Sequence, residues 1–155
     1  MVLGLSLMMM AASVFAPLQQ YEGTWTVVSA HTAAGNGKPD TVVNRCTEGA
    51  AYYVCEQMVN GKPLALVVFT ATDDPTKFHT QPVLPSGQAV GRSDLTILGN
   101  HWVYLSSGKD AGGKQVYYRT ENVFTGRDKI HFVQYESPDN KTWVIKNQGD
   151  EVRVP

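Results

Sequence analysis

At 155 residues the chain fits one domain, because domains usually span about 100 to 200 residues. Its 13 basic and 14 acidic residues leave a net charge of −1 without long runs of either sign, which excludes the concentrated basic stripe of a nucleic-acid-binding protein. Aromatic and β-branched residues are plentiful while leucine is scarce, a bias that favours strands over helices. We therefore expect a single β domain with no nucleic-acid partner.

The N-terminus is apolar and uncharged. Residues 2–15 form an apolar stretch that is shorter than the roughly 20 residues needed to span a bilayer. This pattern predicts a signal peptide over residues 1–19, a periplasmic or secreted protein, and a mature chain without a transmembrane segment. Pro17 directly after Ala16 and the lack of basic residues ahead of the apolar stretch fit that pattern poorly. The alternative is an N-terminal helix packed across one end of the domain.

From residue 20 to 155 the chain has the pattern of one β domain, with short strand-like segments separated by turn residues. Turn pairs such as Asn60-Gly61, Gly99-Asn100 and Gly112-Gly113 tolerate positive φ, so neighbouring strands should form antiparallel hairpins. No segment after residue 20 keeps a 3.6-residue apolar period, which argues against crossover helices and a parallel sheet. The expected strands are residues 23–32, 40–47, 50–59, 63–71, 76–81, 92–98, 101–106, 115–124, 129–136 and 142–146, with a last one near 150–154.

A meander of this size is best explained by closure, because a closed barrel has no exposed strand edges. The predicted fold class is all-β, a single antiparallel meander β-barrel of about 8–10 strands. A barrel with more than eight strands leaves interior room for a ligand. A two-sheet sandwich is the competing arrangement.

The motif Gly23-x-Trp25 on the first expected strand, together with Arg153 on the last, resembles the calycin superfamily of lipocalins, fatty-acid-binding proteins and bacterial relatives. The resemblance implies structural roles for these three residues, with Trp25 closing the barrel base and Arg153 stacked over its ring. A looser similarity to uncharacterised exported bacterial calycin-like proteins covers about residues 20–154, and it rests on the two cysteines and on residues 99–104, 119–124 and 137–143.

The chain also departs from related families. It lacks the Thr-Asp-Tyr element of true lipocalins, so lipocalin ligands are not implied. It also lacks the glycine-rich extension of the haem-binding nitrobindins and has no histidine after His131. No cofactor is predicted.

The two cysteines, Cys46 and Cys55, lie in neighbouring expected strands. In an exported protein such a pair is more often a disulfide than a catalytic or metal-binding pair. A connection centred between residues 50 and 51 would place the cysteines opposite one another, whereas a tight turn on residues 48–49 would pair Cys55 with Val42 and keep the sulfurs apart. We predict the disulfide, with two buried free thiols as the alternative.

The sequence contains no local pattern for catalysis or metal binding. None of the four histidines has a metal-ligand spacing, so no metal site is predicted. No serine-nucleophile motif is present, and no histidine lies near Cys55 in the sequence. Arg119 and Glu121 share one strand face, where they either line a pocket or form an ion pair on the barrel exterior.

We therefore predict an exported barrel that binds a small hydrophobic or amphipathic molecule without catalysis. Successive strand residues alternate between faces, and on that basis His101 and Phe132 should face inward and their neighbours Trp102 and His131 outward. Neither the identity of the ligand nor the oligomeric state has a signature in the sequence. A barrel enzyme of cyclase or isomerase type, with a lumen acid or base, is the first alternative, and an envelope protein that binds another protein through its outer surface is the second. The expected ligand-binding residues are Tyr52, Val54, Leu66, Val68, His101, Tyr118 and Phe132.

Overall fold

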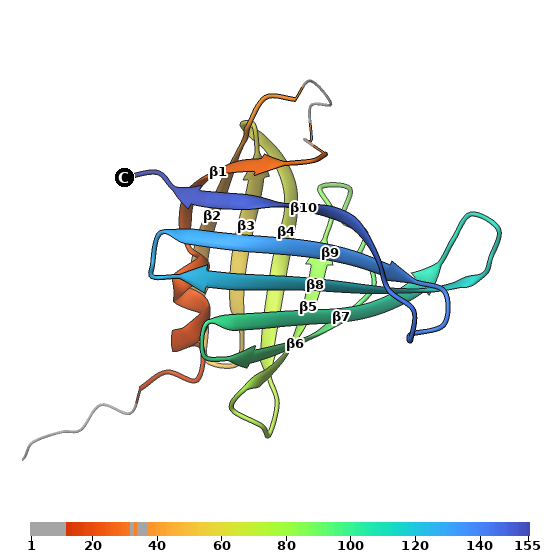
Figure 1. The fold of residues 1–155 in the computed structure, drawn as a ribbon. Helices are drawn as coiled ribbons and strands as arrows, with labels where there is room; N and C mark the ends of the chain where they lie inside the picture. The colour runs from red at the N-terminus through yellow and green to blue at the C-terminus, as the bar shows by residue number, and fades with distance from the viewer. Residues whose placement is uncertain (1–11, 32, 34–36) are drawn as a thin grey trace, which may run out of the picture.

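The computed structural model describes residues 12–31, 33 and 37–155, and these form a closed antiparallel barrel of ten strands with one short 3-10 helix (Figure 1). Each strand pairs with its neighbours along the chain, and β1 pairs with β10 to close the barrel. The predicted meander barrel is confirmed, and the sandwich alternative is wrong. The elements are η1 (Ala16–Tyr21), β1 (Gly23–Ser29), β2 (Asp40–Glu48), β3 (Tyr53–Val59), β4 (Lys62–Ala71), β5 (Lys77–Val83), β6 (Ser93–Leu98), β7 (His101–Lys109), β8 (Gln115–Thr125), β9 (Lys129–Ser137) and β10 (Val144–Arg153).

The hairpins follow the turn residues. Asn60 and Gly61, with φ of 51° and 76°, connect β3 to β4, as the mirror-image two-residue turn requires. The two last expected strands are in fact one, since β10 runs without a break from Val144 to Arg153. Its pairing with β9 shifts between Ile145 and Asn147, and this irregularity accounts for the apparent gap in the sequence pattern.

The pairing of β2 with β3 places Cys46 directly opposite Cys55, and the two sulfurs form a disulfide. Glu48 pairs with Tyr53, so the connection is centred between residues 50 and 51, as direct pairing of the cysteines requires. The predicted disulfide is present, and the free-thiol alternative is wrong.

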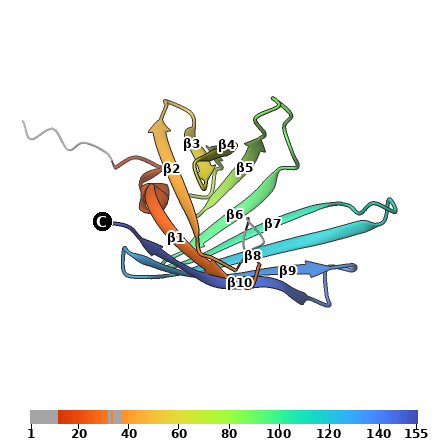
Figure 2. The same cartoon turned by 90° about the horizontal axis from the view of Figure 1, so that it is seen from above.

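One end of the barrel is filled by aromatic side chains. Six of them are at most 2% exposed, and Trp102 packs on Phe124 with ring centroids 4.7 Å apart. The helix η1 lies across this end and buries Leu18 there (Figures 1 and 2). The packed core therefore includes Phe15 and Leu18, which precede β1. The six buried rings are Phe15, Trp25, Tyr53, Phe78, Trp102 and Phe124.

In the described part of the chain, no helix has the length and apolar character needed to cross a membrane.

Candidate ligand cavity

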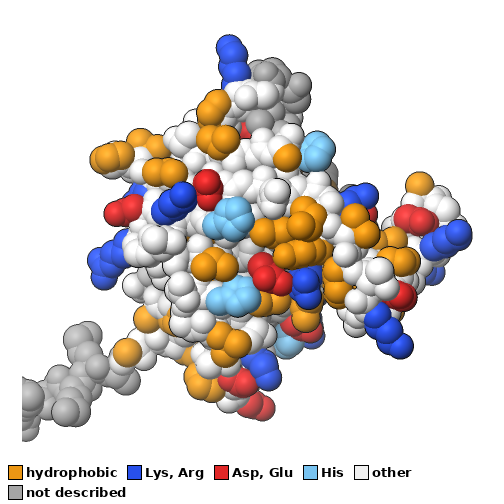
Figure 3. All heavy atoms as spheres, viewed as in Figure 1, with side chains coloured by type: hydrophobic (Ala, Val, Ile, Leu, Met, Phe, Trp, Pro, Cys, Tyr) orange, Lys and Arg blue, Asp and Glu red, His pale blue; other side chains and the backbone are white. Residues whose placement is uncertain are grey.

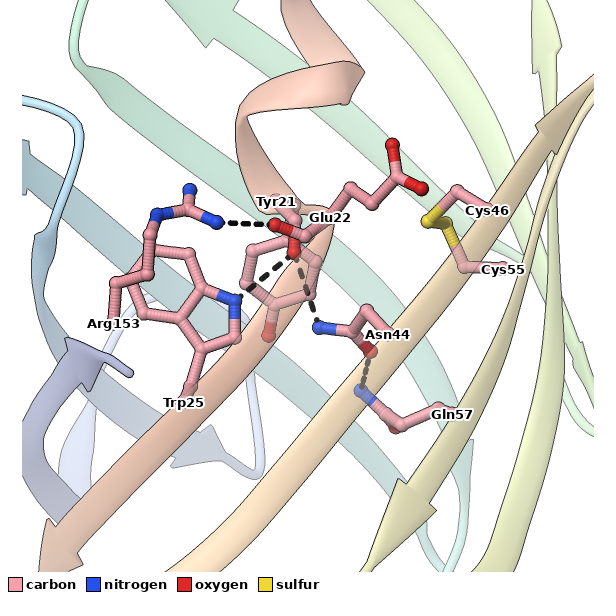
Figure 4. The surroundings of a disulfide bond; sticks show 8 residues. All are labelled: Tyr21, Glu22, Trp25, Asn44, Cys46, Cys55, Gln57 and Arg153. Atoms are coloured by element: carbon pink, nitrogen blue, oxygen red, sulfur yellow. Dashed lines mark hydrogen bonds between the residues drawn. A yellow bond between two sulfur atoms is a disulfide. The ribbon is translucent and has the colours of Figure 1, made fainter. Parts of the chain in front are cut away.

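The base of the barrel is built around Trp25, which is fully buried. The guanidinium carbon of Arg153 lies 4.3 Å from the centre of the indole ring, and the Trp25 Nε1–H donates to the Tyr21 carbonyl at 3.1 Å (Figure 4). Arg153 is fixed in turn because its guanidinium donates to the carbonyls of Gln20 and Glu22. Trp25 and Arg153 thus hold the arrangement that the calycin resemblance implies.

Gly23 is part of the same arrangement. Its φ is +122°, a region that side-chain-bearing residues rarely adopt, and an added Cβ would lie 2.5 Å from Nη1 of Arg153. Glycine at this position therefore lets the guanidinium reach both the Trp25 ring and the carbonyls of the η1 segment.

A chain of hydrogen bonds joins the base to the barrel wall. The Tyr21 carbonyl also accepts from the Asn44 side-chain amide at 3.3 Å, and the Asn44 oxygen accepts from the Gln57 amide at 3.1 Å (Figure 4). Asn44 is only 2% exposed, so these bonds are made in the interior of the barrel. They orient two polar side chains that line the space above the base.

That space is a cavity of about 580 Å³, within the range of pockets that hold small molecules. Its apolar lining comes from Val27, Val42, Val59, Val67, Phe69 and Phe132, among others. Its polar lining includes Asn44, Gln57, Thr80, Thr120, Asn122 and Gln134. A lining with both characters suits an amphipathic molecule better than a purely apolar one.

Two buried acids line the cavity, Asp40 on β2 at 6% exposed and Glu151 on β10 at 8% exposed. The second of them, Glu151, is the less well paired. Its Oε2 has no hydrogen-bond partner among the described residues. Burial raises the pKa of Glu151 from 4.5 to about 7. Burial, and then the nearby Glu151 charge, raise the pKa of the Tyr21 and Tyr104 phenols. The cavity thus holds a carboxyl that changes protonation near neutral pH beside two neutral phenols.

Most of the residues expected to line the cavity lie elsewhere. Tyr52 and Leu66 are 48% and 43% exposed, and Tyr118 is 37% exposed, while Val54 and Val68 are half-buried outside the lining set. Of the seven expected residues, Phe132 lines the cavity.

The prediction that His101 faces inward and Trp102 outward is wrong. Trp102 is 1% exposed in the aromatic base, and Tyr104, on the same face of β7, lines the cavity. The His101 side chain is 39% exposed on the outer face of the barrel, and its Nε2 lies 3.2 Å from Oε2 of Glu121. On β9 the expected directions hold, because Phe132 faces the cavity and His131 pairs with Asp150 outside.

The outer face of β7–β9 carries a polar and aromatic cluster. Glu121 forms an ion pair with Arg119 at 3.0 Å, and its carboxylate lies 3.2 Å from Nε2 of His101. The Arg119 guanidinium stacks 4.4 Å from the Tyr135 ring and 4.7 Å from the Trp143 ring. Figure 3 shows acidic, basic, histidine and hydrophobic side chains side by side on this face. Arg119 and Glu121 therefore form the exterior ion pair that was one of the two alternatives.

The histidines do not converge. His79, His101 and His131 each pair with a single carboxylate on a different part of the sheet. In the described part of the chain, no group of three or more histidine, cysteine, aspartate or glutamate side chains is placed to hold a metal ion.

Sequence reasoning missed the polar lining and Glu151. One signal for the lining is present, because the disulfide fixes which faces of β2 and β3 point inward. Asn44 and Gln57 lie two residues from Cys46 and Cys55 on those same faces. For Glu151 the sequence has no such signal, since an isolated glutamate on a strand is ordinarily exposed.

Comparison with known proteins supports the fold of the chain but does not indicate its function. Among solved structures, the chain is similar to Rv2717c from M. tuberculosis, with a TM-score of 0.56 and 16% sequence identity. The match covers 94% of this chain and 100% of that one. No protein-family model and no curated protein sequence matches the chain. The structural likeness shows that the chain shares the overall fold of Rv2717c, which in this chain is a closed antiparallel barrel.

Proposed function

We propose that the barrel binds a small amphipathic molecule in its lumen and does not transform it. The observation that carries this proposal is the cavity of about 580 Å³, closed below by the aromatic base and lined by both apolar and amide side chains. A barrel that served only as a scaffold would gain stability by filling this space, because interiors normally pack without large voids. The calycin-like fold is compatible with such a role.

Obstructing the lumen should weaken binding. Thr120 lines the cavity, and Thr120→Phe would place a ring inside it. We expect this variant to bind the neutral dye Nile red at least about tenfold more weakly than the wild type, because the ring occupies space that the ligand needs. Fluorescence titration measures the dissociation constants.

His101→Phe is the matched control, since it adds a ring of the same size to the outer face, where the His101 side chain is 39% exposed. It should bind Nile red as the wild type does. Equal weakening by both substitutions would place the dye outside the lumen. If the wild type binds no Nile red and native mass spectrometry finds no molecule retained from expression, the binding proposal is wrong.

A second candidate function is acid–base catalysis on a bound molecule. The observation that favours it is Glu151, whose pKa of about 7 suits a general acid or base at neutral pH. On this hypothesis Glu151→Gln would leave binding of the retained molecule intact and abolish its turnover. Absence of any pH-dependent turnover in the wild type would favour the non-catalytic proposal.

We also propose that the chain is exported after removal of an N-terminal leader, and the disulfide supports an oxidising destination. Phe15 and Leu18 are 2% and 1% exposed within the core, so cleavage beyond residue 14 would strip side chains from the barrel base. We therefore expect a mature N-terminus between about residues 12 and 14, as measured by N-terminal sequencing of the exported protein. An intact Met1 chain in the cytoplasm would contradict export, and a mature chain starting at residue 17 or later would contradict the packing argument.

A further inference from the structure

The charge that faces the cavity is negative. Among the described residues that line it, the carboxylates are Glu151 and Asp40, the one imidazole is His31, and lysine and arginine are absent. The two carboxylates come from the strands on either side of β1, and both pair in register with Val27. An anionic head group would be repelled in this setting, whereas a cationic one would be attracted.

The two carboxylates differ in what they already bind. Asp40 accepts hydrogen bonds from the Ala33 backbone at 2.6 Å and from the Asn60 amide at 2.7 Å, so both of its oxygens are engaged. Glu151 is only 8% exposed, yet its Oε2 has no hydrogen-bond partner among the described residues. An unpartnered buried carboxylate oxygen is costly, and a donor supplied by a ligand removes that cost. A hydrogen-bond donor on the ligand would therefore gain more binding free energy at Glu151 than at Asp40.

Resting on the proposed binding in the lumen, we infer that the ligand is an amphipathic primary amine whose ammonium group donates to Glu151. The ammonium supplies both the missing donor and the compensating charge, and charge-assisted hydrogen bonds are about twice as strong as neutral ones. The apolar tail lies along Val27, Val67 and Phe132, which line the same cavity. The proposal selects against fatty acids, whose carboxylate would face Glu151.

Binding of such an amine depends on pH. Burial raises the pKa of Glu151 to about 7, so the carboxylate that the ammonium needs is mostly present at pH 8 and mostly protonated at pH 6. The affinity for the amine should fall about tenfold between these pH values. The other titratable groups that face the cavity are the Tyr21 and Tyr104 phenols, Asp40 and His31, and the neighbouring strands present Val27 and Ile130 in register with Glu151.

The test compares three probes that share a ten-carbon tail: decylamine, decanol and decanoate. Isothermal titration calorimetry of the full chain at pH 8 should show decylamine binding at least about tenfold more tightly than decanoate. The preference should vanish in Glu151→Gln, which keeps the shape of the side chain and removes the charge. Glu56→Gln is the matched control, because Glu56 is exposed on the outer face of β3 and should leave the preference unchanged.

The outcomes separate this inference from the proposed function. If decanoate or decanol binds as tightly as decylamine, the lumen binds ligands and the amine inference is wrong. The inference also fails if Glu151→Gln keeps the preference for decylamine or its dependence on pH. If none of the three probes binds the wild type while Nile red does, the amine inference alone is wrong. If neither Nile red nor any of the three probes binds and no molecule is retained from expression, both proposals are overturned.

Discussion

Replacing Trp25 by alanine should lower the free energy of unfolding by about 3 to 5 kcal/mol, the cost of truncating a large buried aromatic side chain. The loss is large because Trp25 is fully buried, donates to the Tyr21 carbonyl and carries the Arg153 guanidinium on its ring. Truncation leaves a cavity at the base and removes the surface on which Arg153 stacks. Chemical denaturation followed by circular dichroism measures the change.

Trp143→Ala is the control for this prediction. Trp143 stacks on Arg119 at the outer surface and is only half-buried, so its truncation should cost less than about 1.5 kcal/mol. If Trp25→Ala unfolds at the same denaturant concentration as the wild type, the base does not hold the barrel closed in the way described.

The unliganded protein should become less stable as the pH rises from about 4.5 to 7, owing to Glu151. Its pKa is raised by burial from 4.5 to about 7, so in this window the unfolded chain loses the Glu151 proton while the folded barrel keeps it. The folded state then binds more protons, and stability falls with rising pH, by about 3 kcal/mol in total by pH 8. Thermal or denaturant unfolding across this pH range measures the slope.

Glu151→Gln isolates the contribution, since the amide does not ionise. The variant should be more stable than the wild type at pH 8 and close to it at pH 4.5. Asp74 and Asp139 change the stability in the opposite direction at lower pH. Hydrogen bonds lower the pKa of each to about 2, so the stability that they contribute is lost as the pH falls. Wild-type and Glu151→Gln stabilities that run parallel across this range would show that Glu151 is not buried as a neutral acid.

The sequence predicts the barrel because its turns are encoded locally and because closure removes the exposed edges that a meander of this size would otherwise leave. Asn60 and Gly61 favour the backbone conformation of a two-residue hairpin wherever they occur in a strand-rich chain. The disulfide is predicted because a pair of cysteines on neighbouring strands of an exported protein is usually bonded, but the sequence leaves two registers open. The structure has the register with the connection centred between residues 50 and 51.

The directions of the side chains are harder to predict, because this barrel carries apolar residues on both faces. Leu66 and Leu105 are 43% and 45% exposed, so hydrophobicity does not separate inside from outside on β4 or β7. A register shift on β4 adds to the difficulty. Leu64 and Val67 are an odd number of residues apart, and both line the cavity.

Glu151 escapes prediction for a different reason. Only the three-dimensional arrangement shows that Glu151 lines the lumen near Tyr21 and Tyr104. Burial of this kind runs against the ordinary preference of glutamate for water. A site that contradicts the general rule of burial is typical of a position kept for binding or chemistry.

The pairing of β1 with β10 has a consequence for how the protein is made. Trp25 on β1 pairs with Arg153 on β10. The barrel therefore cannot close on the ribosome before β10 has emerged. The pairing of β1 with β10 also requires glycine at position 149, because an added Cβ would lie 2.1 Å from the Val28 carbonyl oxygen. The Cys46–Cys55 bond does not depend on this closure, because it joins the adjacent strands β2 and β3, which can pair before β1 meets β10.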